Sequence, residues 1–178
     1  VYAQLRYLRP RQQRWVNPSI QVAPSPHLAR VRLAGPARRP DLLIVTEGMT
    51  DALTVADAGC PAVALLGVGL ADKRMALTVA QRWPTQHLVV AFDAGNSGRR
   101  ASAQFVELLA EVGAANRTSV LELPLAVDDL NEWRQVGDCD FRSQLSQALP
   151  RLRSVKQGLV QTAPLAPPAS PVRGLGLT

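Results

Sequence analysis

Four short apolar runs lie in the middle of the chain, and a segment with helical spacing of apolar residues separates each run from the next. The runs predict β-strands at 42–46, 62–66, 88–92 and 118–123. Predicted helices follow at 49–58, 73–82, 97–113, from about Asp129 onward, and 140–149, with Asp72 capping the second and Asn96 or Ser97 the third. This alternation predicts an α/β fold: a mostly parallel sheet of about four strands with right-handed crossovers and helices on both faces.

The two ends of the chain lack this pattern. Residues 1–40 are rich in Pro and Arg, so no long regular element is expected there, although Tyr2–Leu8 alternates weakly enough for an edge strand. Residues 151–178 end in a Pro/Ala/Gly-rich stretch that predicts a flexible tail. We therefore divide the chain into a basic segment 1–40, a folded domain 41–150 and a tail 151–178, and expect it to be a piece of a longer protein because it opens on Val in mid-pattern.

The composition, the net charge and the cysteine spacing limit which kinds of protein the chain can be. The 178 residues carry 47% apolar residues, enough for one core, and a net charge of +6. The basic residues gather before the first strand and after the last helix, which indicates a polyanionic partner or simply an Arg-rich composition. No stretch is long enough to cross a membrane, and Cys60 and Cys139 have no zinc-ligand spacing, so a reducing cytoplasmic location is expected.

Acidic residues follow the predicted strands. Glu47 and Asp51 come after the first strand, Asp93 after the third, and Asp129 after the fourth. Each one alone is explained by a turn or a helix start. Because the carboxyl ends of parallel strands meet at one edge of a sheet, the set together predicts a site for magnesium and phosphate.

The basic and glycine-rich positions near this edge can be interpreted either as functional or as purely structural. Lys73, Arg99 and Arg100 lie near helix starts, where they can meet phosphates or simply face solvent. Gly67-Val68-Gly69 lacks the third glycine of a dinucleotide loop and is interpreted as a plain turn. The histidines and tryptophans show no ligand spacing and are interpreted as structural or exposed positions.

The acidic strings occur in the order of a known family. Glu47-Gly48-Met49-Thr50-Asp51, then Asp93 to Ala101, then Asp129-Leu130-Asn131-Glu132 resembles the Toprim domain, which DnaG-type bacterial primases share with type IA and type II topoisomerases and some nucleases. The resemblance is strongest to primases of phages and mobile elements. Asp93, Gly98 and Ala101 fit the spacing of the primase D-x-D-x-A-G-x-x-A string, and residues 15–19 resemble an upstream primase string.

The resemblance, which spans about residues 14–135, implies roles. Glu47 would be the general acid/base or a carboxylate near the metal, Asp93 a ligand of Mg²⁺ (or Mn²⁺), and Asp129 a holder of a second ion, with Asp51 shaping the site. The implied reaction is nucleotidyl transfer from nucleoside triphosphates to an RNA primer on single-stranded DNA, with a replicative helicase as a further partner. Arg14 and Asn17 are expected to contact nucleic acid.

One position departs from the family string, because Gly95 stands where the second Asp is expected. Three alternatives therefore stay open beside a primase. The chain is a non-catalytic nucleic-acid-binding Toprim module, a Toprim nuclease or topoisomerase fragment, or an unrelated small-molecule phosphotransferase. A topoisomerase needs a tyrosine nucleophile, and Tyr2 and Tyr7 both lie in the irregular N-terminal segment; a phosphotransferase leaves the basic flanks without a purpose.

Overall fold

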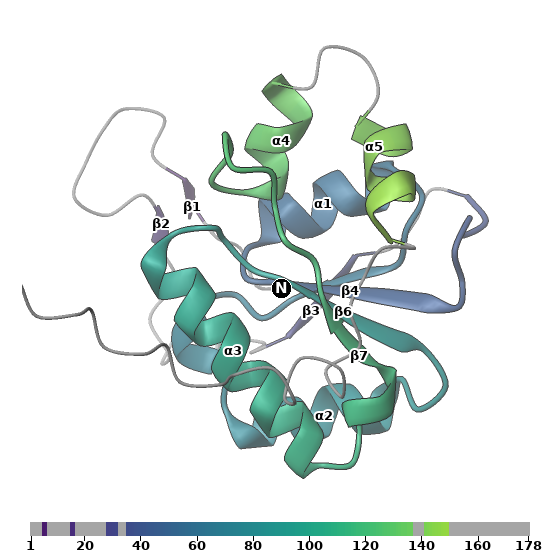
Figure 1. Ribbon diagram of the computed structural model, residues 1–178, viewed down its shortest axis with the longest axis vertical. Helices are drawn as coiled ribbons and strands as arrows, with labels where there is room; N and C mark the ends of the chain where they lie inside the picture. Colours follow the sequence, from purple (N-terminus) through teal and green to yellow (C-terminus); the bar gives the residue numbers. More distant parts are fainter. Residues whose placement is uncertain (1–4, 7–14, 17–27, 32–34, 137–140, 150–178) are drawn as a thin grey trace, which may run out of the picture.

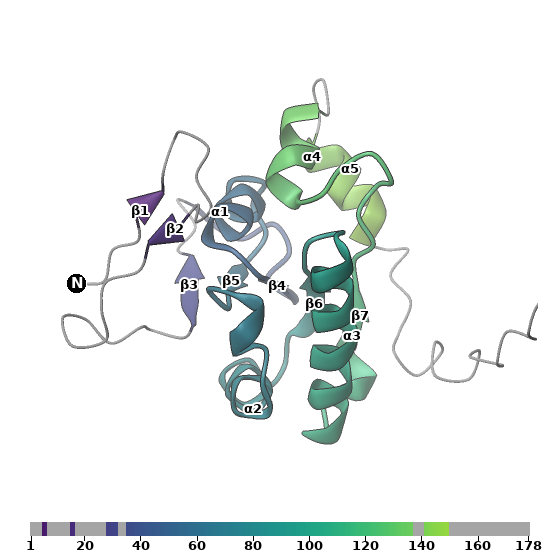
Figure 2. The same ribbon diagram turned by 90° about the vertical axis from the view of Figure 1, so that its left-hand side faces the viewer.

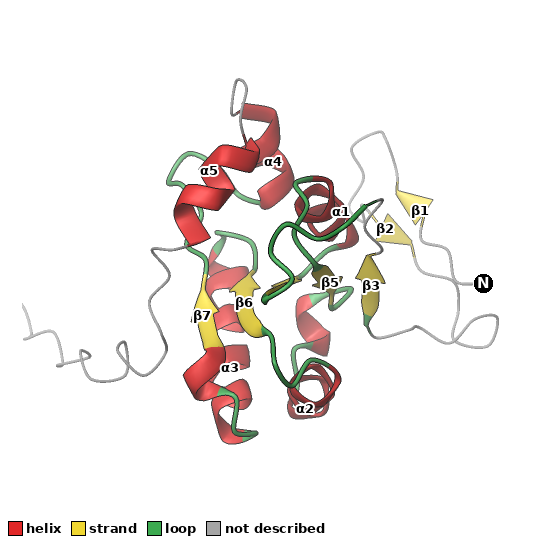
Figure 3. Cartoon of the chain, turned by 90° about the vertical axis from the view of Figure 1, so that its right-hand side faces the viewer, coloured by secondary structure: helices red, strands yellow, loops and turns green. Residues whose placement is uncertain are grey.

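A five-stranded sheet forms the centre of the protein. The computed structural model describes residues 5–6, 15–16, 28–31, 35–136 and 141–149. The strand order is β3-β5-β4-β6-β7, in which β5, β4, β6 and β7 are parallel and β3 pairs antiparallel with β5 (Figures 1 and 3). The bounds are β3 Ala29–Val31, β4 Leu42–Thr46, β5 Ala62–Ala64, β6 His87–Ala91 and β7 Thr118–Val120.

Helices cover both faces of the sheet. Figures 1 and 2 show α1, α4 and α5 on one face and α2 and α3 on the other. Their bounds are α1 Met49–Asp57, α2 Lys73–Arg82, α3 Asn96–Glu111, α4 Leu130–Val136 and α5 Phe141–Ala148, with 3₁₀ turns η1 at Val68–Leu70 and η2 at Ala115–Arg117. Each layer has its own apolar core, because a strand such as β4, buried at all five positions, offers side chains to both faces.

The predicted α/β fold is confirmed, with two additions and one correction. β3 adds an antiparallel edge strand to the sheet. β1 (Leu5–Arg6) lies within the weak edge strand predicted at Tyr2–Leu8, and it pairs with an unpredicted strand, β2 (Trp15–Val16), in a separate two-stranded sheet. Asp72 caps α2 as predicted, because its carboxylate accepts the N–H of Met75 at 2.8 Å. The predicted cap of α3 is wrong: Gly95 is the N-cap and makes no side-chain hydrogen bond, because the helix starts early enough to place Asn96 and Ser97 inside its first turn.

The structure also tests predictions made for single residues, for the loop after β5 and for membrane-spanning segments. Trp83, Trp133 and Cys60 are buried in the cores, whereas Cys139 and His27 lie outside the described residues. The turn after β5 forms η1, which agrees with the plain-turn interpretation of Gly67-Val68-Gly69. Within the described ranges, no helix has the length and apolar character needed to cross a lipid bilayer.

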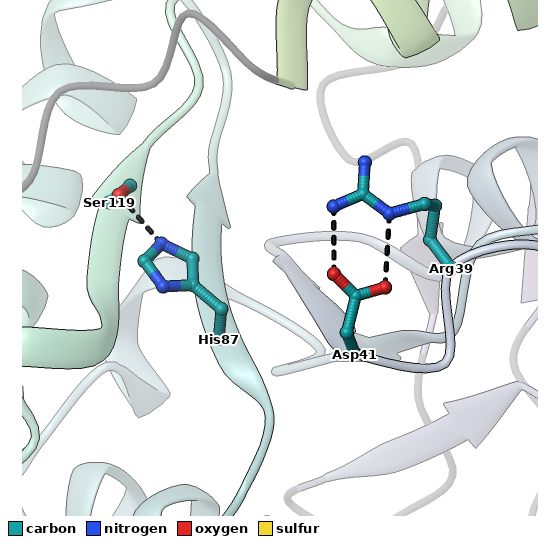
Figure 4. A network of polar contacts seen from close by, with 4 residues as sticks. All are labelled: Arg39, Asp41, His87 and Ser119. Carbon is teal, nitrogen blue, oxygen red and sulfur yellow. Dashed lines mark hydrogen bonds and ion pairs between the residues drawn. The ribbon is translucent and has the colours of Figure 1, made fainter.

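Polar side chains at the amino edge of the sheet are paired with one another. Arg39 binds both carboxylate oxygens of Asp41, at 3.0 and 2.8 Å, and His87 Nε2 lies 2.8 Å from Ser119 Oγ (Figure 4). His87 therefore has a structural role, as expected. Arg117 donates to the carbonyls of Ala80, Trp83 and Gln86, and so neutralises the carbonyl end of α2.

Candidate metal and phosphate site

The sheet brings Glu47 and Asp93 to the same edge. β4 and β6 are neighbouring parallel strands in which Thr46 pairs with Ala91, so Glu47 follows one strand directly and Asp93 follows the other by two residues. Adjacent strands lie only about 4.8 Å apart. The N–H of Gly67 donates to the Glu47 carbonyl at 3.2 Å and fixes the backbone there. Both predicted residues therefore lie at the carboxyl edge, where parallel sheets bind ligands.

The turn from β4 into α1 buries a third acid, Asp51. Thr46 Oγ1 donates to the Gly48 carbonyl at 2.9 Å and holds the turn closed. Gly48 is the N-cap of α1, and a Cβ there would lie 3.0 Å from Asp51 Oδ2, so the glycine leaves room for the carboxylate. The Asp51 residue is only 6% exposed. It is therefore a buried carboxylate of the first helical turn rather than a solvated one.

The segment before α4 joins Asp51 to Asp129. The N–H of Asn131 donates to Asp51 Oδ1 at 3.2 Å. Asp129 Oδ1 accepts the N–H of Glu132 at 2.6 Å, and the Glu132 carboxylate accepts the N–H of Asp128 at 2.6 Å, which together resemble a capping box. The start of α4 thus presents Asp129 beside the first turn of α1.

The loop after β6 is tied to the same segment. The N–H of Ala94 donates to the Asp128 carbonyl at 2.7 Å, so Asp93 and Asp128 belong to loops held together by their backbones. Asp128 was not predicted as a site residue, because the sequence gives no sign that its backbone would be bonded to the loop after a different strand.

The acids at this edge repel one another. Burial, together with the charges of Asp129 and Asp93, raises the pKa of Asp51 to about 7 against an opposing effect of the Asn131 N–H. Burial raises the pKa of Asp93 as well, and the charges of Asp129 and Asp128 add to the effect. Asp129 therefore lies close enough to both Asp51 and Asp93 to disfavour their ionisation, and a bound cation would relieve that repulsion.

The donor chemistry fits a hard divalent ion. Every candidate ligand is a carboxylate oxygen, which Mg²⁺ and Mn²⁺ prefer, and Mg²⁺ commonly keeps several waters rather than a full set of protein ligands. Among the described residues, no three His, Cys, Asp or Glu side chains are already arranged as metal ligands. The structure thus gathers the predicted acids Glu47, Asp51, Asp93 and Asp129 at one edge without a preformed ligand cage.

Gly98 explains part of the sequence string that follows Asp93. A Cβ at Gly98 would lie 2.3 Å from the carbonyl oxygen of Asp93 and 2.9 Å from its carbonyl carbon, distances that no side chain tolerates. The first turns of α3 therefore pack directly against the backbone that carries Asp93. Gly95, by contrast, has no atom within 4 Å of its Cβ position, so the expected carboxylate would fit there sterically.

The structure separates the predicted basic residues. Arg99 and Arg100 are exposed in the first two turns of α3, and Arg99 Nε donates to the Ala94 carbonyl next to Asp93. Lys73 instead pairs with Glu111 at 2.9 Å, in the last turn of the 16-residue α3. Such a helix is about 24 Å long, so the Lys73 ammonium lies far from Asp93, and its predicted contact with phosphate at this edge has no support. Arg14 and Asn17 lie outside the described residues.

A comparison with models of protein families shows which family the chain belongs to. The model of a family described as Toprim-like matches residues 44–133, which span β4 to α4 and include all four predicted acids. The chain belongs to the Toprim-like family. Toprim domains generally bind divalent metal ions. The acid cluster formed by Glu47, Asp51, Asp93 and Asp129 lies within the segment that the family model matches.

Two solved structures are similar to this Toprim domain. One is bacteriophage T7 lagging-strand DNA polymerase interacting with primase domains of two gp4 subunits bound to an RNA/DNA hybrid and dTTP, at 30% identity and a TM-score of 0.48, covering 61% of this chain and 54% of that chain. The other is the primase fragment of the bacteriophage T7 primase-helicase protein, at 26% identity and a TM-score of 0.47, covering 61% and 45%. The chain thus spans about half of each. No curated protein matches it.

Proposed function

We propose that this Toprim domain is the catalytic part of a DNA primase, which makes RNA primers on single-stranded DNA by metal-dependent nucleotidyl transfer. The observation that supports the proposal most is the gathering of Glu47, Asp51, Asp93 and Asp129 at one sheet edge, with charges close enough to raise the pKa values of Asp51 and Asp93. Family membership supports the same chemistry. The net charge of +6 suits a polyanionic template.

The proposed roles follow from where each side chain lies. Asp93 and Asp129 are half-buried and hold Mg²⁺ or Mn²⁺, while buried Asp51 positions them through its charge and its bond to the Asn131 N–H. A bound ion of this kind supplies charge stabilisation for the attacking 3′-hydroxyl and the leaving pyrophosphate. Glu47, directly after β4, is the general acid/base or a further metal-proximal carboxylate. Arg99 and Arg100 contact phosphates from the first two turns of α3.

A specific observation favours a second candidate function. Gly95 removes one carboxylate from the family string, and the space around it shows that packing does not require a glycine there. A non-catalytic Toprim module that binds nucleic acid through basic residues is therefore the alternative. It predicts binding to single-stranded DNA without a divalent ion. A replicative helicase stays a predicted partner of either form.

A primer-synthesis assay tests the proposal. The full chain is given single-stranded DNA, nucleoside triphosphates and Mg²⁺, and is compared with Glu47→Gln and Gly95→Asp. We expect Glu47→Gln to abolish synthesis and Gly95→Asp to leave it unchanged or raise it, because the added carboxylate restores a ligand. Glu107→Gln, at an exposed position of α3, is the matched control and should behave as wild type.

Two results would count against a primase. Synthesis that survives Glu47→Gln would remove the proposed chemistry from this edge. An absence of primers from wild type, together with DNA binding that is equal with and without Mg²⁺, would favour the non-catalytic module.

A further inference from the structure

The turn that follows β5 has an unusual backbone conformation. Leu66 has a φ of 64° and Gly67 a φ of 139°, both positive. Within the described part of the chain, Leu66 is the only residue other than glycine with a positive φ. A residue with a Cβ adopts this conformation at a cost in free energy, and such costs cluster at functional sites. The surroundings of the turn indicate what this cost achieves.

The turn bonds β5 to the residue that directly follows β4. The N–H of Leu65 donates to the Thr46 carbonyl at 3.0 Å, as in a regular parallel pair. Continued pairing would bring the next N–H on that side, that of Gly67, to the Gly48 carbonyl. The Gly67 N–H instead donates to the Glu47 carbonyl at 3.2 Å. The turn therefore ends the regular pairing and attaches β5 to the backbone of Glu47.

The Gly48 carbonyl is already used by the start of α1. It accepts Thr46 Oγ1 at 2.9 Å and the N–H of Ala52 at 3.3 Å. Continued pairing of β5 would compete for this oxygen. The turn therefore lets α1 begin immediately after Glu47 while the Glu47 backbone stays bonded to the neighbouring strand.

The two residues stabilise the turn in different ways. The side chain of Leu66 is half-buried and packs against the apolar core under α1, α4 and α5, which offsets the cost of its backbone conformation. No atom lies within 4 Å of the Cβ position of Gly67, so a glycine is favoured there by its φ and not by a lack of space. Packing at one residue and backbone freedom at the next thus fix the turn.

We propose that Leu66 and Gly67 are positioning residues for Glu47. The proposal rests on the proposed function, in which Glu47 is the general acid/base. The two residues act by fixing the Glu47 carbonyl, and with it the point on the backbone from which the carboxylate side chain starts. A reacting group displaced by about 1 Å can lose about 100-fold in rate.

Four substitutions test the turn. Leu66→Ala removes the packing, and Gly67→Ala adds a Cβ in open space and so changes only the backbone conformations that are allowed. Gly69→Ala is the matched control, because Gly69 is exposed, has no positive φ and also has no atom within 4 Å of its Cβ position. Leu66→Met keeps the apolar volume and should behave as wild type.

Hydrogen exchange tests the bond to Glu47 without relying on activity. The exchange rate of the amide of residue 67 is measured by NMR in the full chain, without DNA or metal, and corrected for the intrinsic rate of each residue type. We expect this amide to exchange at least about tenfold faster in Leu66→Ala and Gly67→Ala, because its hydrogen bond opens more often. Gly69→Ala and Leu66→Met should match wild type.

Primer synthesis tests the consequence for the reaction. Well below the melting temperature of each variant, Leu66→Ala and Gly67→Ala should lower kcat about 10–100-fold, with a KM for nucleoside triphosphates within about twofold of wild type. A purely structural role would lower the melting temperature and leave kcat unchanged. Gly69→Ala and Leu66→Met should keep the wild-type kcat.

The outcomes separate this proposal from the proposed function. Unchanged kcat in Leu66→Ala and Gly67→Ala, or unchanged exchange of the residue 67 amide, overturns the positioning role alone. An equal loss of kcat in Gly69→Ala does the same, because the effect would then belong to the whole loop. A wild-type chain that makes no primers overturns both proposals.

Discussion

The pKa values of aspartates are shifted in opposite directions at the two edges of the sheet. At the amino edge, the two hydrogen bonds from Arg39 hold the pKa of Asp41 below its usual value. At the carboxyl edge, burial and neighbouring acids raise the pKa values of Asp51 and Asp93. At the amino edge, opposite charges are paired within the fold, as Figure 4 shows for Arg39 and Asp41. At the carboxyl edge, several carboxylates lie close to one another.

The difference between the two edges indicates which carboxylates of this fold are available to bind a ligand. A carboxylate that already has a cationic partner contributes to the local structure and has little left to offer a ligand. Neighbouring acids that raise the pKa values of Asp51 and Asp93 cost stability, and carboxylates perturbed in this way are commonest at functional sites. The raised pKa values at the carboxyl edge therefore support the proposed metal site, whereas the ion pair at the amino edge contributes to the local structure.

The largest expected effect is the loss of primer synthesis on removal of Asp93, which we compare with removal of an acid at the other edge. Asp93→Asn should lower primer synthesis by at least about 100-fold, because the neutral amide no longer holds the ion. Asp41→Asn, its counterpart at the amino edge, should leave the rate as it is. Initial rates at saturating Mg²⁺ measure both, and equal losses from the two variants would end the distinction between the edges.

The charge of Asp51 should set the pH dependence of stability. Its folded pKa of about 7 lies above the unfolded value, so the folded state binds more protons between about pH 4 and 7, and stability falls as pH rises through that window. Asp51→Asn keeps the oxygen that accepts the Asn131 N–H and removes the charge. In the absence of metal it should raise the free energy of unfolding at pH 8 by about 2–4 kcal/mol.

Urea unfolding at a series of pH values checks this expectation. Wild type should lose stability from pH 4 to pH 8, and Asp51→Asn should lose much less. Curves that stay parallel for the two proteins over the whole range would show that Asp51 is not the group that titrates.

Backbone packing at the carboxyl edge should depend on Gly98. Gly98→Ala places a Cβ against the Asp93 carbonyl and should cost about 1–3 kcal/mol of stability, together with weaker metal binding, because the loop that carries Asp93 must move. Gly95→Ala is the matched control, since its Cβ meets nothing within 4 Å. Thermal unfolding of the two variants provides the comparison, and similar losses from both would contradict the packing argument.

The smallest effect is expected at the amino edge. Asp41→Asn breaks an ion pair whose side chains are 40% and 58% exposed, so it should cost less than about 1 kcal/mol, and less still in high salt. Denaturant unfolding at low and high ionic strength measures it. A cost of several kcal/mol would mean that the pair contributes more to the fold than its exposure allows.

Much of the fold could be predicted from the sequence because its strands are continuous apolar runs. Leu42–Thr46 is buried at every position, and the prediction of that strand matches its observed bounds. β3 could not be predicted, because three residues among prolines and arginines become a strand only through pairing with β5, more than 30 residues away. The cap of α3 was misassigned because Gly95, Asn96 and Ser97 are all common at helix starts.

The site was predictable in part for a similar reason. Parallel strands bring Glu47 and Asp93 to one edge whatever their exact lengths, so chain order alone was sufficient. The burial of Asp51 depends on how α4 packs against α1, and the position of Lys73 depends on the length and direction of α3. Both are tertiary features without a local signature.

A titration with Mg²⁺, followed by thermal unfolding at pH 8, tests the metal site most directly. An ion that binds only the folded protein must stabilise it, so saturating Mg²⁺ should raise the melting temperature of wild type by about 5 °C. Asp93→Asn should show little of this rise, and Asp41→Asn should show all of it. A wild-type melting temperature that does not respond to Mg²⁺ or Mn²⁺, or one that responds equally in Asp93→Asn, would contradict a metal site at the carboxyl edge.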